Sequence, residues 1–160
     1  MRSTSPLVLR RRLWLCAATS FLLAGLSTTR VEAALGEDVS SIAAVQARLK
    51  ASIQVHRRSR YTVHELALPT GTRVRELVGD TGKVFSVSWS GGFRPNLRDL
   101  MGTHYDRFIA ATRGRRARRR IMRIELPGMV VVMGGRLRNF FGQVTLTDLV
   151  PAGLTPEDLR

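Results

Sequence analysis

The stretch Val84-Phe-Ser-Val-Ser-Trp-Ser90 alternates large apolar and small polar side chains without interruption. In an extended strand, such alternation places Phe85, Val87 and Trp89 on one face and the three serines on the other. One face would then pack on a core while the other meets water, as is common in antiparallel sheets. The stretch therefore predicts an antiparallel sheet with one covered face.

Two further β-rich segments precede this strand and are separated from it by turn signals. Residues 61–68 end at Pro69-Thr70-Gly71, and residues 72–78 end at Gly79-Asp80-Thr81-Gly82. Pro, Asp and Gly supply the backbone angles that tight turns need. The three strands are therefore expected to form a meander.

Two amphipathic helices and a second group of strands complete the expected domain. The first helix covers residues 38–54 and is followed by a polar connector at residues 56–60; the second begins at Asn96, a suitable N-cap, and ends near Thr112. After a basic loop, the expected strands cover residues 121–126, 129–133 and 136–146, with turns at 127–128 and 134–135 and a short helix start at 155–158. The order αβββαβββ indicates a single α+β domain in which antiparallel hairpins pack with the two helices.

Residues 1–33 contain the three parts of a signal peptide in order. A basic start precedes the apolar run Leu13 to Leu26, and Val31-Glu32-Ala33 offers small side chains at the positions that a signal peptidase reads. The apolar run has 14 residues, which is short for a stable transmembrane helix. We expect cleavage after Ala33, export to the periplasm or the extracellular space, and no transmembrane segment in the exported residues 34–160.

The sequence leaves two export routes open. Residues 11–15 partly resemble a twin-arginine motif, but the trailing lysine is missing, which favours the general secretory route. The only cysteine, Cys16, lies inside the apolar run, so lipid anchoring is disfavoured and the exported chain contains no cysteine. Thiol catalysis, disulfides and thiolate metal sites are thereby excluded from the exported chain.

Positive charge is concentrated in one short segment. The chain has 26 Lys and Arg against 12 Asp and Glu, a formal net charge of +14. Without residues 1–33, 21 basic and 11 acidic side chains remain, and six of the basic ones lie within residues 113–120. These candidate anion-binding residues are Arg113, Arg115, Arg116, Arg118, Arg119 and Arg120.

Two interpretations of this basic loop remain open. Guanidinium groups bind carboxylate and phosphate bidentately, so the loop is suited to clamp an anionic polymer of the cell envelope or a partner protein. Nucleic acid is disfavoured as a partner because no aromatic side chain interleaves with the arginines. The alternative, which the composition favours, is a solvated loop in a chain that uses arginine for almost every positive charge.

The sequence contains no motif of a known catalytic centre. Asp80-Thr81-Gly82 matches the tripeptide of aspartic proteases, but its place between two strands predicts a tight turn. The histidines His56, His64 and His104 lack the spacing of zinc ligands, and no Gly-x-Ser-x-Gly, Gly-x-Gly-x-x-Gly or P-loop motif occurs. We therefore expect no catalytic residue, cofactor or metal ion.

Two hypotheses about function follow from the residues. The leading one is an exported, non-enzymatic protein that binds an anionic component of the cell envelope or a partner protein. The alternative is a small hydrolase or metal-dependent enzyme of the envelope that uses His64, His104 and nearby carboxylates. The sequence leaves the ligand, the pathway and the oligomeric state open.

Several stretches of the chain together resemble one protein family. They are ALGE (34–37), YTVHELALPTGTRVRELV (61–78), GKVFSVSW (82–89), PNLRDLMGTHYDRF (95–108), PGMVVVMGGRLRNFFGQV (127–144) and LVPAGLTPEDLR (149–160). Over nearly all of residues 34–160, the chain resembles the family catalogued as domain of unknown function 2844, small exported proteins of proteobacteria. The resemblance implies a single exported domain in a Gram-negative envelope and supplies no catalytic residues.

The anion-binding hypothesis for the basic loop makes a measurable prediction. The purified exported form should be retained on a polyanion column and released by moderate salt, because salt screens exposed charges. Replacing the five arginines from Arg115 to Arg120 with serine should sharply lower the salt concentration at elution. Unchanged retention of this variant would exclude the loop as the contact.

Overall fold

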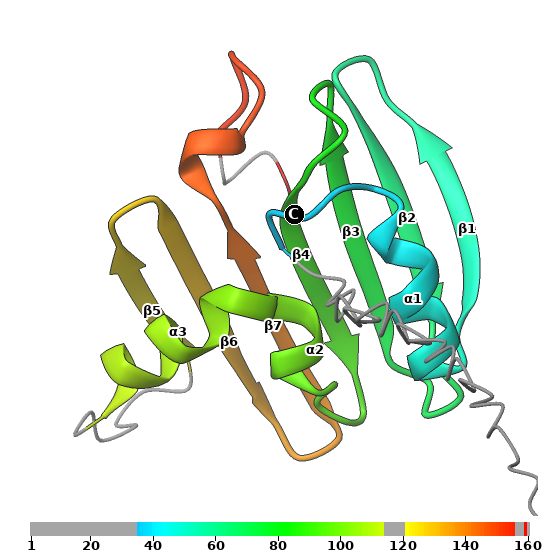
Figure 1. The fold of residues 1–160 in the computed structure, drawn as a ribbon. Coiled ribbons are helices and arrows are strands. Elements are labelled where there is room, and N and C mark those ends of the chain that lie inside the picture. Colours follow the sequence, from blue (N-terminus) through cyan, green and yellow to red (C-terminus); the bar gives the residue numbers. More distant parts are fainter. Residues whose placement is uncertain (1–34, 114–120, 156–158, 160) are drawn as a thin grey trace, which may run out of the picture.

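The computed structural model describes residues 35–113, 121–155 and 159, and these form one seven-stranded antiparallel sheet (Figure 1). The strand order is β1-β2-β3-β4-β7-β6-β5, so pairing of β4 with β7 joins two meanders into one sheet. The strands are β1 (Ser52–Arg57), β2 (Tyr61–Ala67), β3 (Arg73–Gly79), β4 (Val84–Gly91), β5 (Ile121–Leu126), β6 (Met129–Arg136) and β7 (Asn139–Thr145). The single-domain α+β fold expected from the sequence is confirmed.

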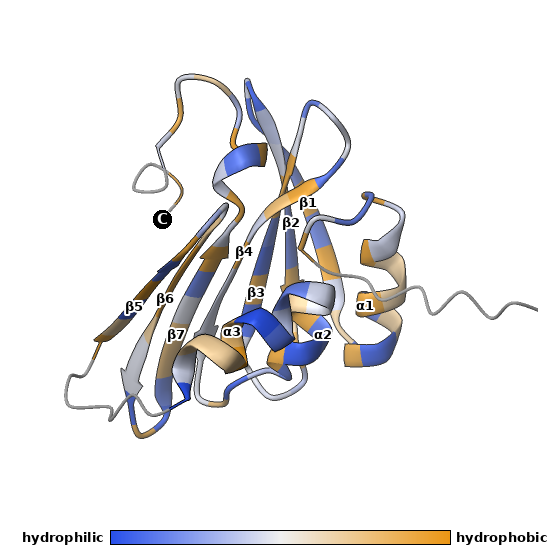
Figure 2. Cartoon of the chain, turned by 60° about the vertical axis from the view of Figure 1, so that its left-hand side comes forward, coloured by the Kyte–Doolittle hydropathy of each residue, from blue (hydrophilic) through white to orange (hydrophobic). Residues whose placement is uncertain are grey.

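The helices lie together on one face of this sheet (Figures 1 and 2). They are α1 (Ser41–Leu49), α2 (Leu97–Met101), the short 3-10 helix η1 (Gly102–His104) and α3 (Tyr105–Thr112), followed by the 3-10 turn η2 (Thr147–Leu149) after β7. The main hydrophobic core fills the space between this layer and the sheet. An ion pair of 3.0 Å between Arg48 and Asp99 links α1 to α2, and Arg107 donates a hydrogen bond of 2.7 Å from α3 to the carbonyl oxygen of Pro127.

The central strand β4 contains a β-bulge that its alternating sequence does not predict. Leu77 pairs with Ser86 and Val78 pairs with Val84, so Phe85 is an extra residue without a partner in β3. A bulge of this kind rotates the strand locally and changes the face to which the following side chains point. The simple alternation of the sequence therefore breaks at Phe85.

The bulge turns Phe85 away from the helices. The expectation that Phe85 shares a face with Val87 and Trp89 is wrong, because those two side chains lie in the main core whereas Phe85 belongs to a second, smaller cluster. The buried members of this second cluster are Val63, Leu77, Phe85 and Leu159. It lies on the other face of the sheet and is covered by the C-terminal part of the chain.

A tryptophan packed on a glycine fills the junction between the two meanders. Trp89 on β4 and Gly142 on β7 are cross-strand partners, and Trp89 is only 4% exposed within the main core. A Cβ atom at position 142 would overlap the indole ring. Position 142 therefore requires glycine for reasons of space, since its φ is not in the left-handed region.

The first predicted helix is too long, and a strand takes its second half. The helix α1 ends at Leu49, Lys50 adopts a left-handed conformation with φ of 50°, and the chain then extends as β1. No glycine or proline marks this end in the sequence, and Ile53 continues the helical spacing that begins at Ile42 and Val45. Most of β1 is exposed because it forms an edge of the sheet. Its sequence therefore shows only a weak alternation of apolar and polar residues.

Two other boundaries differ from the sequence-based expectation. The glycines at 134 and 135 lie inside β6 rather than in a turn, and the chain reverses at Leu137 and Arg138. The predicted helix from Asn96 to Thr112 is divided at Gly102 into α2, η1 and α3. Of the predicted helix start at 155–158, residues 156–158 lie outside the described residues.

Replacing Gly142 with alanine should destabilise the fold. The added methyl group must displace the buried Trp89 ring, and overpacking of this kind costs about 1–3 kcal/mol. Gly79→Ala is a matched control, because Gly79 also lies in a strand without a positive φ and its Cβ would make only ordinary contacts, the nearest at 3.5 Å. Urea unfolding should separate the two variants; equal stability would disprove the packing argument.

Candidate functional site

The face of the sheet opposite the helices, here called the open face, is covered at only one end in the described residues. The C-terminal segment covers the end near Phe85, where Leu149, Val150 and Leu154 pack on the second cluster. The other end, where β3 begins at Arg73 and β4 ends at Gly91, carries no helix or segment of the described chain. Side chains at that end therefore face outward from a rigid sheet.

Antiparallel pairing arranges these side chains in two rows across the strands. The first row is Glu65, Arg75, Ser88, Gln143 and Val132, in the order β2, β3, β4, β7 and β6. The second row is Ala67, Arg73, Ser90, Phe141, Gly134 and Ile121, and it continues to β5. The second row changes from Arg73 and Ser90 to the apolar Phe141 and Ile121. The first row reaches the apolar Val132 on β6 and then ends at the charged Arg123 on β5.

These rows line a groove of about 510 Å³, called the open-face groove below. Its lining residues are Arg73, Arg75, Ser88, Trp89, Ser90, Ile121, Val132, Phe141, Gly142 and Gln143. A second hollow of about 330 Å³ shares Arg73, Arg75 and Ser90 with it and extends the depression toward His56 and Glu65. A volume of this size is typical of sites that hold a small molecule.

Arg75 is the central cation of the open-face groove. It is half-buried in the middle of β3, and within the described part of the chain its side chain has no hydrogen bond or ion pair. Its neighbour Arg73 is exposed and lies 3.7 Å from a carboxylate oxygen of Glu65. Because the Arg75 side chain is half-buried and its guanidinium has no partner in the described residues, this arrangement favours an anion at Arg75.

A buried hydrogen-bond network adjoins the groove and includes one of its lining residues, Gln143. The side chains of Ser86 and Thr145 share a hydrogen bond of 2.8 Å, and the amide of Gln143 donates to the Ser86 hydroxyl at 3.3 Å. Ser86 is fully buried rather than exposed to water as the alternation suggested, because the second cluster and Thr145 cover it. This network holds Gln143 in place within the groove.

The other side of the open-face groove is apolar and open to solvent. Ile121 is 54% exposed and Phe141 is 36% exposed, which is high for large apolar side chains. Gly134 stands between them in the second row, and Val132 is the β6 residue of the neighbouring first row. The groove therefore combines a cationic end with an apolar end.

Of the six candidate anion-binding arginines, the structure describes Arg113, and Arg113 does not line the open-face groove. Arg113 is exposed at the end of α3, and the remaining five arginines of the basic loop lie outside the described residues. The sequence reasoning missed the groove, although Arg73-Val74-Arg75 alternates like the serines of β4. That alternation was a signal for two cations on one face, but only the strand register shows that they meet Ser88 and Ser90.

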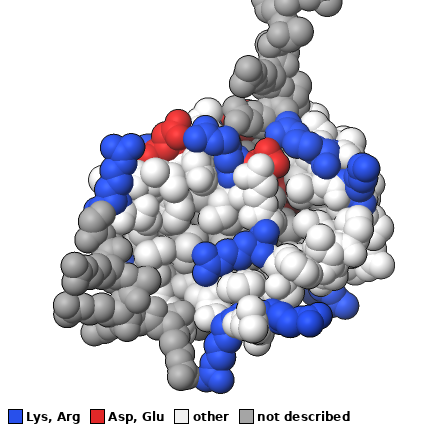
Figure 3. Space-filling model, turned by 90° about the horizontal axis from the view of Figure 1, so that it is seen from below, with Lys and Arg blue, Asp and Glu red and all other residues white. Residues whose placement is uncertain are grey.

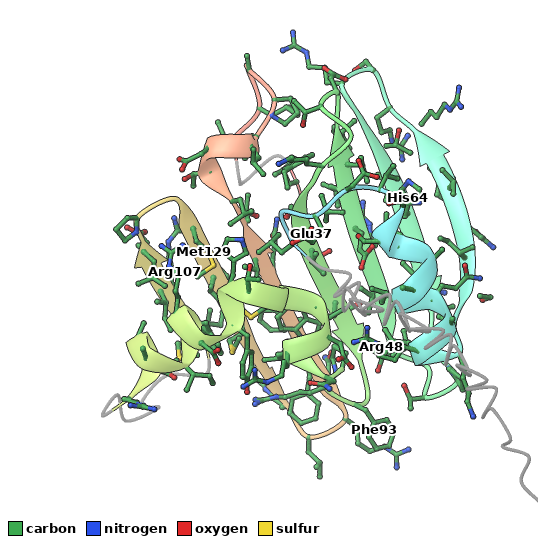
Figure 4. The ribbon with its side chains drawn as sticks, viewed as in Figure 1. Glu37, Arg48, His64, Phe93, Arg107 and Met129 are labelled. Atoms are coloured by element: carbon green, nitrogen blue, oxygen red, sulfur yellow. The ribbon has the colours of Figure 1, made fainter. Side chains whose placement is uncertain are left out.

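The two histidines of the enzyme hypothesis are not brought to the groove. His64 lies on β2 and points to the helix-covered face as the partner of Glu76, and burial lowers its pKa (Figure 4). His104 ends η1, where burial and the nearby Arg107 lower its pKa while Glu37 opposes them. The sequence Asp80-Thr81-Gly82 forms the expected turn between β3 and β4, with φ of 75° at Gly82.

No group of three or more His, Cys, Asp or Glu side chains in the described part of the chain is placed to hold a metal ion. None of its helices has both the length and the hydropathy required to cross a bilayer.

Glu76 is a buried carboxylic acid directly behind the cation of the groove. It is 1% exposed on the helix-covered face of β3, between His64 on β2 and Val87 on β4, and neither of its carboxyl oxygens has a hydrogen-bond partner among the described residues. Burial raises its pKa to about 7. The side chain is thus neutral below pH 7 and unfavourably charged above it.

Comparison with known proteins assigns the chain to a family. A family model described as "Protein of unknown function (DUF2844)" matches residues 31–159, so the chain belongs to this family. No curated protein and no solved structure matches the chain significantly. The family membership agrees with the resemblance seen in the sequence.

Replacing Glu76 with glutamine should remove a pH dependence of stability. The folded protein keeps the proton of Glu76 up to about pH 7, whereas the unfolded chain loses it near pH 4.5, so stability falls as the pH rises between these values. From pH 5 to pH 8 the wild type should lose roughly 2–3 kcal/mol relative to the Glu76→Gln variant. Urea unfolding of both proteins measures this difference; a difference that stays constant from pH 5 to pH 8 would contradict a raised pKa.

Proposed function

We propose that the protein is an exported, non-enzymatic binding protein whose open-face groove holds a small anionic amphiphile. The carboxylate or phosphate head of this ligand binds at Arg75, and its aliphatic part lies over Val132, Phe141 and Ile121. The observation that carries the proposal is the half-buried guanidinium of Arg75, which has no partner in the described chain and lies beside an apolar surface.

The cationic end suits an anionic head group in three respects. The partly desolvated guanidinium of Arg75 offers several N–H donors in a plane. The hydroxyl groups of Ser88 and Ser90 flank it in the neighbouring strand and are able to donate further hydrogen bonds. Arg73 adds a second positive charge at the rim, while Glu65 offsets part of it.

The apolar end suits an aliphatic chain. Four strand spacings separate β3 from β5, which corresponds to about 19 Å across the sheet. An extended chain that follows the rows from Arg75 toward Ile121 covers apolar surface that is now exposed to water. Burying that surface supplies the hydrophobic part of the binding free energy.

Export and an envelope location are part of the proposal and rest on the N-terminal sequence. The basic start, the apolar run and the small residues before Ala34 support a cleaved signal peptide. The proposed ligand is still an anionic component of the cell envelope, as the composition suggested. Its principal contact is now the open-face groove. The basic loop at 113–120 then contributes general attraction for anions.

Calorimetry with laurate tests the proposal. Laurate should bind the wild type, whereas acetate, which lacks the tail, and dodecyltrimethylammonium, which has a cationic head, should bind far more weakly. Replacing Arg75 with glutamine should weaken laurate binding roughly 10- to 100-fold, since hydrogen bonds to charged groups contribute about 1.5–3 kcal/mol.

Arg57→Gln is the matched control, because Arg57 is exposed on β1 at the other end of the sheet and does not line the groove. This variant should bind laurate like the wild type. Equal loss in both variants, or equal binding of the cationic amphiphile, would refute the proposal.

A further inference from the structure

The end of the sheet nearest the open-face groove carries a small apolar and basic protrusion. Leu137, in the turn between β6 and β7, is 87% exposed, and Phe93, in the segment after β4, is 58% exposed. Figure 4 shows Phe93 at the lower end of the molecule, where the β6–β7 turn also lies in Figure 1. We call Gly92–Arg94 together with Arg136–Asn139 the apolar tip.

The two segments of the apolar tip lie next to each other. Gly91 pairs with Phe140 at the ends of β4 and β7, and a Cβ atom on Gly92 would lie 3.8 Å from the carbonyl oxygen of Arg138. The guanidinium carbon of Arg94 lies 4.8 Å from the centre of the Phe140 ring. Leu137 and Phe93 are therefore exposed on one surface and not scattered.

Turn geometry does not account for the residues at this tip. Arg138 has φ of 62°, a left-handed conformation that glycine or asparagine adopts more easily. Leu137 occupies a fully exposed turn position that polar residues normally fill. Neither residue helps the hairpin to form, so a contact made by their side chains is needed to explain them.

The charges around the tip have one sign. Arg94, Arg136 and Arg138 are exposed there, and neither residues 91–96 nor residues 134–140 contain an acidic side chain. Figure 3 looks onto this end of the molecule and shows more blue Lys and Arg side chains than red Asp and Glu side chains, with neutral surface between them. Val55 on β1 is also exposed, but its cross-strand neighbour is His64 and not a large apolar residue.

We propose that the apolar tip docks on the surface of an anionic phospholipid bilayer. Leu137 and Phe93 enter the boundary between head groups and acyl chains, and the three arginines bind lipid phosphates. The exposed apolar side chains suit the acyl region of the bilayer, and the neighbouring arginines suit its anionic head groups. The contact is independent of any ligand in the groove.

A fluorescent label at the tip tests the docking directly. In a Cys16→Ser background, Leu137→Cys and, separately, Val55→Cys introduce one cysteine each for an environment-sensitive dye such as NBD. Vesicles of phosphatidylcholine containing a quarter phosphatidylglycerol should shift the emission of the label at 137 to the blue and leave that at 55 unchanged. Because the readout is local, binding through residues 1–33 does not mimic it.

Charge variants separate lipid contact from general attraction. Arg136→Ser with Arg138→Ser should weaken the vesicle-dependent shift at position 137 roughly thirtyfold in lipid concentration, since each arginine near an anionic surface contributes about a factor of five. Arg57→Ser with Lys83→Ser removes the same charge from the opposite end and should have little effect. Arg75→Gln should leave the shift intact, which keeps docking distinct from ligand binding.

Three results would overturn the proposal. They are a label at 137 that stays in a polar environment with anionic vesicles, an equal shift at 55, and an equal loss in the two double charge variants.

Discussion

The contact between the Trp89 ring and the bare backbone of Gly142 holds the two parts of the sheet together. The meander β1–β4 and the meander β5–β7 touch through one strand pair, β4 with β7, whose residues are about fifty positions apart in the chain. The indole fills the volume over that pair as part of the main core, which also contains Ile42 and Val45 of α1 and Phe108 of α3. Without this contact, the two halves of the sheet would not hold Arg75 and Val132 in fixed positions relative to each other.

The bulge at Phe85 decides how much of the open face stays accessible. By turning one large aromatic side chain outward at that end, it creates an apolar surface that the C-terminal residues cover. Beyond the bulge the normal alternation returns, and the small side chains of Ser88 and Ser90 leave space above the sheet. The extra residue in β4 thus separates the end of the open face that the C-terminal residues cover from the end that carries the open-face groove.

The sequence was sufficient for what depends on local pattern and insufficient for what depends on register. The strands β2 to β5 and the turn at Asp80 were predictable because alternation and turn residues are local properties. The strand β1 was missed because it is an exposed edge strand directly after a helix whose spacing it continues. Gly135 was read as a turn residue, but its lack of a Cβ serves the close approach of the Asn139 backbone across the hairpin.

The groove itself could not be predicted, since it combines residues of five strands. The alternation in Arg73-Val74-Arg75 and in the serines of β4 indicated two polar faces, and nothing in the sequence said that they were the same face. The pairings Arg75 with Ser88 and Arg73 with Ser90 settle that point. A similar argument applies to Glu76, whose burial follows from its place in a central strand and not from its residue type.

The geometry also relates the groove to the apolar tip. Ser90 and Phe141 line the groove as a pair, and the next pair along the same strands, Gly91 and Phe140, leads directly into the tip. The groove therefore opens at the end of the sheet that carries Leu137 and Arg138. If that end rests on a bilayer, an anionic amphiphile passes between membrane and groove along β4 and β7 over the four residues from Leu137 to Phe141, roughly 14 Å. A short path of this kind lets the aliphatic chain avoid exposure to bulk water, and such exposure is the main barrier to moving it.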